Sequence, residues 1–205
     1  MLKKLTDGIM AGIMIALGGS VFLAVRAESL IAAAVLFSVA LLCICFKGYS
    51  LFTGKVGYIV ESHKKADFET LLLGLLGNLI GTYVCGLLIS VPFKNYSALA
   101  KELCTAKMAQ TVPEALIRAL FCGILMYLAV SIYREKQSIA GILFCVPVFI
   151  LSGFEHSIAN MFYFAASGIV SFRAFLYLWL IIIGNAAGGM LLPALSLIGK
   201  EKNNA

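Results

Sequence analysis

The sequence GFEHSIANM (residues 153–161) places a glutamate and a histidine inside one of the longest apolar runs of the chain. Between Ile139 and Val170, Glu155 and His156 are the only acidic, basic or histidine side chains. A titratable residue at membrane depth is costly and usually marks an ion or proton pathway. Because glycine, serine and asparagine lie beside this pair, the stretch predicts a helix that is broken around a buried polar site.

The composition around this stretch predicts an all-α membrane protein with a single transmembrane domain over residues 1–205. Of the 205 residues, 61% are hydrophobic and 13% are charged, about half the charged fraction of an average soluble domain. The length allows about six helices of ~20 residues. The net charge of +6 comes from basic residues scattered between apolar segments. This pattern fits the positive-inside rule and argues against a nucleic-acid partner.

The six cysteines indicate neither a metal site nor a redox centre. Each lies in or near an apolar segment, and no pair has the CxxC spacing, so we expect small buried hydrophobic side chains and no metal or cofactor. Lys3 and Lys4 precede an apolar, glycine-rich run to Val25. That run is long for a signal peptide and predicts the first membrane helix.

Six membrane spans are expected, and two of them are too long for one simple crossing. The second and fifth contain polar, glycine-bearing interruptions at Lys47–Gly54 and Gly153–Asn160. Each predicts two half-helices joined by a loop that is buried in protein or lines a wet cavity. The longest polar connection, 92–113, contains a possible amphipathic helix over Ala98–Met108. The expected spans are 8–25, 29–60, 68–91, 114–133, 138–170 and 174–198.

The distribution of basic residues predicts that both termini lie in the cytoplasm, because the cytoplasmic side of a membrane protein carries more lysine and arginine. With the N-terminus inside, the inner segments hold Lys3, Lys4, Lys64, Lys65, Arg134, Lys136, Lys200 and Lys202, whereas the outer segments hold Arg26, Lys94, Lys101, Lys107 and Arg173.

The sequence also repeats itself. Phe22–Val25 (FLAV) recurs as Tyr127–Val130 (YLAV), 105 positions later, and Gly77–Gly81 (GNLIG) recurs as Gly184–Gly188 (GNAAG), 107 positions later. The two broken segments are separated by a similar interval. These matches predict two repeats of three spans, about 1–91 and 107–198. An odd number of spans per repeat inserts the second copy upside down, and such inverted repeats place a pathway near the midplane.

Taken together, these motifs resemble the formate/nitrite transporter family, whose members are pentameric anion channels with an aquaporin-like protomer. The resemblance covers essentially the whole chain, and GFEHSIANM is its most specific part. The other motifs that carry it are Leu51-Phe52-Thr53-Gly54, Gly77–Gly81, Lys107 followed by Arg118 and Leu128–Val130, and Gly184-Asn185.

The resemblance implies roles for individual residues. Thr53 is expected in the loop that interrupts the second helix, and His156 is expected to begin the second half of the fifth helix and to face Thr53. Imidazole can donate to an anion, or pass a proton so that a weak acid crosses in neutral form. Lys107 is expected to fold toward the pore and to attract anions. Asn185 is expected either to donate to the same site or to tie helices together.

Apolar side chains beside the breaks match the constrictions of the family, which strip water and exclude hydrated ions. The expected constriction residues are Leu51, Phe52 and Phe149. Two departures bear on the substrate more than on the fold. Gly123 stands where many members have asparagine, and Lys55 follows LFTG where asparagine is common.

The sequence therefore predicts a channel for small monovalent anions of weak acids, formate first and nitrite second, with passive or proton-linked flow. Hydrosulfide, acetate and lactate remain alternatives. The expected partners are the anion, the lipid bilayer of the cytoplasmic (inner) membrane and four further copies in a homopentamer. A membrane enzyme would need a nucleophile–base pair or a metal cluster, and an aquaporin-type channel for neutral solutes would carry paired Asn-Pro-Ala motifs. Neither pattern is present. A purely structural membrane protein would show no flux.

Overall fold

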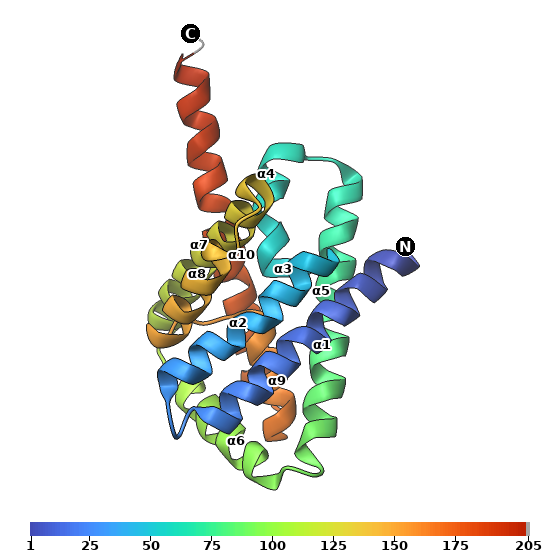
Figure 1. Ribbon diagram of the computed structural model, residues 1–205, viewed down its shortest axis with the longest axis vertical. Coiled ribbons are helices and arrows are strands. Elements are labelled where there is room, and N and C mark those ends of the chain that lie inside the picture. Colours follow the sequence, from blue (N-terminus) through green and yellow to red (C-terminus); the bar gives the residue numbers. More distant parts are fainter. Residues whose placement is uncertain (204–205) are drawn as a thin grey trace.

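Helices make up all the regular secondary structure in residues 1–203, the part of the chain that the computed structural model describes (Figure 1). In chain order they are α1 (Leu2–Val25), α2 (Leu30–Lys47), α3 (Phe52–Lys55), the 3-10 helix η1 (Val56–Tyr58), α4 (Ile59–Ser62), α5 (Lys65–Ser90), α6 (Lys94–Met108), α7 (Val112–Lys136), α8 (Ala140–Leu151), α9 (Ser157–Ser167) and α10 (Phe172–Asn203).

The membrane-spanning pattern agrees with the predicted six crossings. Within the described residues, α1, α2, α5, α7 and α10 are each long and apolar enough to span a membrane. The remaining apolar helix, α8, has 12 residues and is too short alone, since a span needs about 20. It forms the fifth crossing together with α9. The expected amphipathic helix is α6, which begins at Lys94 rather than at Ala98.

The second and fifth crossings are broken, as predicted, but each break is shorter than the sequence suggested. The second interruption covers only residues 48–51, and Gly48 starts it with a left-handed backbone (φ 70°) that favours glycine. The expectation that Thr53 lies in this loop is wrong, because the helix resumes at Phe52. The fifth interruption covers 152–156 and contains Gly153 (φ 67°), so Asn160 belongs to α9.

The two predicted repeats correspond to α1–α5 and α7–α10, and they pack in the same way. Helix α1 lies against α5, and α7 lies against α10. The first halves of the two broken crossings, α2 and α8, pack on each other. Each second half crosses to the opposite repeat, because α9 packs on α5 while α3, η1 and α4 pack on α10. The breaks therefore meet where the two repeats join.

The register of the repeats differs from one sequence match. A Cβ atom on Gly81 of α5 would meet the carbonyl of Ile9, and one on Gly188 of α10 would meet the carbonyl of Leu120. Ile9 and Leu120 are 111 positions apart, so α1 and α7 are related by 111 residues. The match of Phe22–Val25 to Tyr127–Val130, at 105, is out of this register and is wrong as a structural equivalence.

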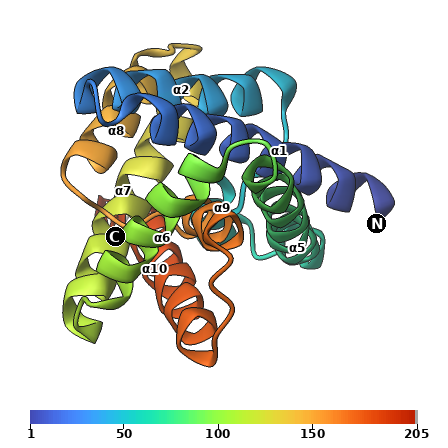
Figure 2. The same cartoon turned by 90° about the horizontal axis from the view of Figure 1, so that it is seen from below.

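Helix α9 occupies the middle of the molecule, where α1, α5, α6 and α10 surround it (Figure 2). All 11 of its residues are buried. Helix α6 lies at the end of the molecule opposite the C-terminus (Figure 1). A hydrogen bond of 2.7 Å from Arg173 Nη2 to the carbonyl of Met108 fixes its last turn. This placement brings Lys107 to the end of α9 at which the break lies.

Candidate functional site

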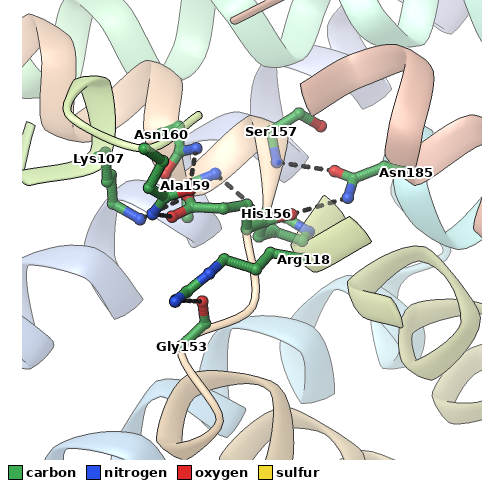
Figure 3. Close-up of polar contacts among 10 residues, drawn as sticks. Lys107, Arg118, Gly153, His156, Ser157, Ala159, Asn160 and Asn185 are labelled. Carbon is green, nitrogen blue, oxygen red and sulfur yellow. Dashed lines mark hydrogen bonds and ion pairs between the residues drawn. The ribbon is translucent and has the colours of Figure 1, made fainter. Parts of the chain in front are cut away.

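Asn185 and Asn78 form equivalent sets of hydrogen bonds to the backbone at the two breaks. Asn185 Oδ1 accepts the backbone N–H of Ser157, the first residue of α9 (2.8 Å). Its Nδ2 donates to the carbonyl of Glu155 at 2.8 Å (Figure 3). The same Nδ2 donates to the carbonyl of Ala119, also at 2.8 Å. One side chain thus satisfies backbone groups that the break removes from the helical pattern, which would otherwise be costly inside a membrane.

Asn78 makes the same three bonds in the first repeat. Its Oδ1 accepts from the backbone N–H of Phe52, and its Nδ2 donates to the carbonyls of Ser50 and Gly8, all at 2.9 Å. This external acceptor is why α3 begins at Phe52 and carries Thr53 in its first turn. The two GN motifs therefore act as structural ties in both repeats.

The two breaks meet through the side chains of Thr53 and His156. Thr53 Oγ1 lies 2.9 Å from His156 Nε2, and both residues are buried. His156 is also the N-cap residue of α9, and its Nδ1 accepts the backbone N–H of Ala159 at 3.1 Å (Figure 3). A polar contact between the two repeats is thus formed here by a hydroxyl and an imidazole.

These contacts define the tautomer of His156. A backbone N–H can only donate, so Nδ1 must offer its lone pair to Ala159. The neutral ring then carries its proton on Nε2 and donates it to Thr53 Oγ1. The hydroxyl hydrogen of Thr53 is left to point at another acceptor. A second proton, on Nδ1, would face the N–H of Ala159 and would remove the cap of α9.

Aromatic rings cover the imidazole on one side. Phe149 stacks on His156 with ring centroids 5.6 Å apart and an interplanar angle of 25°. Phe37 of α2 packs edge-on against Phe149 at 6.1 Å. Both phenylalanines are buried. The ring of His156 therefore lies between apolar faces on one side and polar groups on the other.

Glu155 points away from Thr53 into a cluster of donors. Its carboxylate accepts from Lys107 Nζ at 2.6 Å, from Gln110 Nε2 at 2.9 Å and from Asn160 Nδ2 at 2.9 Å. The Glu155 side chain is 2% exposed and that of Lys107 is 17% exposed. The Lys107 side chain reaches the second break, where its charge is paired with that of Glu155. The field at His156 is therefore that of an ion pair rather than of a free cation.

Two cavities approach the Thr53–His156 contact. The narrow cavity, of about 220 Å³, is lined by His156, Phe149, Phe37, Lys107 and Arg118, among others. The wide cavity, of about 780 Å³, is lined by residues from Leu51 of the first break to Lys64 between α4 and α5. They share no lining residue. The buried hydroxyl–imidazole pair and the side chains beside it separate them.

The predicted constriction residues are distributed unevenly around this point. Leu51 lines the wide cavity and Phe149 lines the narrow one. Phe52 is buried but lines neither cavity. Asn185 has all its polar groups engaged with the backbone. It is therefore placed as a helix tie, one of the two roles expected for it, rather than as a donor to the site.

Sequence reasoning missed three members of the site. Phe37 looks like any apolar residue of a membrane helix, and only the packing of α2 on α8 brings it to Phe149. Gln110 and Asn160 reach Glu155 from different elements. The sequence signal for these two was weak, although polar side chains this close to a buried carboxylate are candidates for its donors.

No group of three or more His, Cys, Asp or Glu side chains in the described part of the chain is placed to hold a metal ion. The six cysteines are free thiols, buried or half-buried among apolar side chains.

The fold and the site together define a class of protein: an all-helical, multi-pass membrane protein with an aquaporin-like arrangement of two repeats and two broken helices that meet between cavities. The chain belongs to the formate/nitrite transporter family, whose sequence pattern it matches over residues 1–198. Membership places it among transporters and not among enzymes.

Individual relatives agree with this assignment. Uncharacterized transporter YwcJ of Bacillus subtilis (strain 168) is 36% identical over 153 residues, which are 68% of this chain and 60% of that protein. Nitrite transporter NirC of Escherichia coli (strain K12) is 28% identical over 144 residues, 64% of this chain and 54% of that protein. The matched regions thus span 54–60% of the length of these relatives.

A solved structure shares the fold. It is described as a pentameric formate channel with formate bound, and it superposes with a TM-score of 0.80 over 96% of this chain and 95% of that chain, at 23% identity. This likeness confirms the predicted all-α, aquaporin-like architecture.

Proposed function

We propose that the protein is a channel for small monovalent anions of weak acids, with formate as the first substrate and nitrite as the second. The observation that carries this proposal is the buried contact of Thr53 Oγ1 with His156 Nε2, located between a cavity lined in part by α4 and α5 and a cavity lined in part by α6. The names of the relatives, a nitrite transporter and a pentameric formate channel, support these two substrates.

The site lowers the cost of moving an anion through the apolar part of the membrane. A bare charge at this depth is expensive, and close hydrogen-bond donors reduce that cost. The neutral His156 ring donates to Thr53, which leaves the hydroxyl proton of Thr53 to donate to the anion. Leu51 and Phe149 on either side exclude the hydration shell. No covalent step is needed.

The surroundings of the protein follow from the same proposal. We place it in the cytoplasmic membrane as a homopentamer, with both termini and the wide cavity on the cytoplasmic side. The distribution of lysine and arginine supports this orientation. The apolar side chains exposed on α2, α5 and α10 supply the surface for lipid and for neighbouring subunits.

Flux through purified protein in liposomes tests the proposal. Formate and nitrite should pass at pH 6 and pH 7.5 and glycerol should not, with hydrosulfide, acetate and lactate as further arms. The pH inside the liposomes distinguishes the two modes of flow. It should fall as formate enters by proton-linked flow and should stay constant in passive anion flow. Absence of all anion flux from folded protein would refute the channel.

Two substitutions of His156 separate its role at the site from its role as a cap. In His156→Asn the amide oxygen still accepts the N–H of Ala159, because asparagine is a favoured N-cap residue. This variant should fold and should lose most formate flux and its pH dependence. His156→Ala loses both roles and should also be less stable, by about 1 kcal/mol. Wild-type flux in folded His156→Asn would exclude the ring from the pathway.

A further inference from the structure

We propose that Lys55 and Arg134 form a second anion-binding site, in the wide cavity, that takes a small carboxylate or inorganic monovalent anion before it reaches the helix break. The inference rests on the proposed channel function. It identifies the residues that bind the anion at one entrance of the pathway. The starting observation is Lys55, a lysine at a position where asparagine is common in the family. Lys55 takes no part in the Thr53–His156 contact.

The wide cavity gives this site its place. One wall follows the chain from Leu51 at the break, past Gly54 and Lys55, to Ser62 and Lys64 between α4 and α5. The other side includes Tyr133 and Arg134 at the end of α7. With a volume of about 780 Å³, the cavity is more than three times as large as the narrow one, of about 220 Å³. This volume is large enough for a small anion together with its hydration shell.

Lys55 is a half-buried cation that forms no ion pair with the described side chains, residues 1–199. It is the last residue of α3 and lines the cavity. Among the side chains that the structure describes, residues 1–199, no carboxylate lies within 4 Å of its ammonium group. The acidic side chain of Asp7 is already bound to Lys3, at 2.8 Å. A desolvated ammonium gains most from a charged partner, and in this cavity a bound anion can be that partner.

Arg134 adds a second cation that is held by an aromatic ring. Its guanidinium lies 3.9 Å from the centroid of the Tyr58 ring, a geometry that fixes the group without neutralising it. Tyr58 also lines the cavity, and its hydroxyl has no hydrogen-bond partner in the described residues. The residues that carry an ammonium group, a guanidinium group and a phenol hydroxyl thus line one cavity, and each of these groups can donate to an anion.

The two acidic residues that line the cavity, Glu61 and Asp67, form no ion pair with Lys55 or Arg134 in the described part of the chain. Asp67 accepts a hydrogen bond from the hydroxyl of Ser62, and Glu61 is exposed on α4. Both residues flank the α4–α5 connection, and both follow Lys55 along the chain. The narrow cavity is arranged differently, because its lysine is bound to Glu155 at 2.6 Å. The two mouths of the pathway therefore present different fields to an arriving anion.

The test compares formate flux against formate concentration for wild-type protein and four variants in liposomes. Lys55→Gln removes the charge, Lys55→Arg keeps it, and Arg134→Gln removes the second cation. The matched control is Lys64→Gln, which removes an exposed lysine that lines the same cavity. Arg134 is exposed as well, but the Tyr58 ring holds its guanidinium in place. Thermal unfolding in detergent checks that each variant is folded.

We expect Lys55→Gln and Arg134→Gln each to raise the half-saturating formate concentration about tenfold, the loss expected for one charge-assisted hydrogen bond. Maximal flux should change less than twofold, because the Thr53–His156 contact is untouched. Lys55→Arg and Lys64→Gln should stay within twofold of wild type. Unchanged half-saturation in both Lys55→Gln and Arg134→Gln would overturn the second site. Absent flux in the wild type would overturn the channel itself, which is a separate result.

Discussion

At the scale of single residues, His156 combines two tasks that usually fall to different side chains. One ring nitrogen caps α9 and the other meets Thr53. The repeat partner of this position, Leu51, caps nothing with its side chain. The N-cap position is thus polar at one break only, and the matching position of the other break supplies an apolar wall to the wide cavity.

The sequence indicated His156 and Thr53 because both lie in distinctive motifs, but it did not predict the partner of Glu155. Lys107 and Glu155 are 48 positions apart and belong to different elements. Nothing in the local pattern of either residue predicts the other. Only the packing of α6 on α9 brings them to 2.6 Å.

The pair of Lys107 and Glu155 gives a prediction on stability. Lys107→Met or Glu155→Gln alone leaves one buried or half-buried charge without its partner, and each should destabilise the fold by about 3 kcal/mol. The double variant should be less destabilised than the sum of the two. The measurement is the unfolding midpoint in detergent, with Lys101→Met, an exposed lysine on α6, as a control that should shift little. Additive losses would argue against direct coupling.

At the scale of elements, the breaks themselves were predictable and their limits were not. Glycine and polar residues inside a long apolar run identified both interruptions. The helices nevertheless resume earlier than expected, at Phe52 and Ser157, because Asn78 and Asn185 accept their backbone N–H groups from neighbouring helices. A cap supplied from another helix leaves no trace in the local sequence.

The departure at Gly123 also has a structural reason at this scale. A Cβ atom there would meet the backbone carbonyl of Asn185, so glycine allows α7 to approach α10 closely enough for Asn185 to reach Ala119. The same contact exists in the first repeat between Gly12 and Asn78. Close approach through small residues is a common way to pack helices in membranes.

We therefore predict that Gly123→Asn weakens the protein, although asparagine is common at this position in the family. The added side chain pushes α7 from α10, at a cost of about 1–3 kcal/mol, and should also reduce formate flux by loosening the tie at the second break. The unfolding midpoint and liposome flux measure the two effects. Gly199→Asn is the control, since nothing lies within 4 Å of a Cβ there. Equal behaviour of the two variants would contradict the packing argument.

At the scale of the whole molecule, the sequence predicted the number of crossings and the two repeats, but not the register between α1 and α7. Four-residue apolar matches recur by chance in membrane helices, and the match of FLAV to YLAV therefore gave a wrong alignment of α1 with α7. The glycines that contact backbone are a better guide, because their positions are set by the approach of two helices. Gly12 and Gly123 are separated by the structural interval of 111 residues.

The overall charge distribution predicts the orientation in the membrane. A green fluorescent protein fused after Ala205 should fluoresce, and alkaline phosphatase fused there should be inactive, if the C-terminus is cytoplasmic. Phosphatase fused after Lys101, in the connection between α5 and α7, should be active. The structure places that connection at the end opposite the C-terminus (Figure 1). The reverse pattern would show that the protein is inserted the other way.

The ties at the breaks have a consequence for how such a molecule arose. In the described part of the chain, the Asn78 side chain bonds to α1, the first break and the first residue of α3, and the Asn185 side chain bonds to α7, the second break and the first residue of α9. Each triplet of crossings therefore supplies the asparagine tie of its own bend, while its second half-helix packs on the other triplet. Two copies of one such triplet, inserted in opposite orientations, would each carry the tie for a bend. The two triplets of this chain differ at the residue that precedes the resumed helix, which is Leu51 in one and His156 in the other.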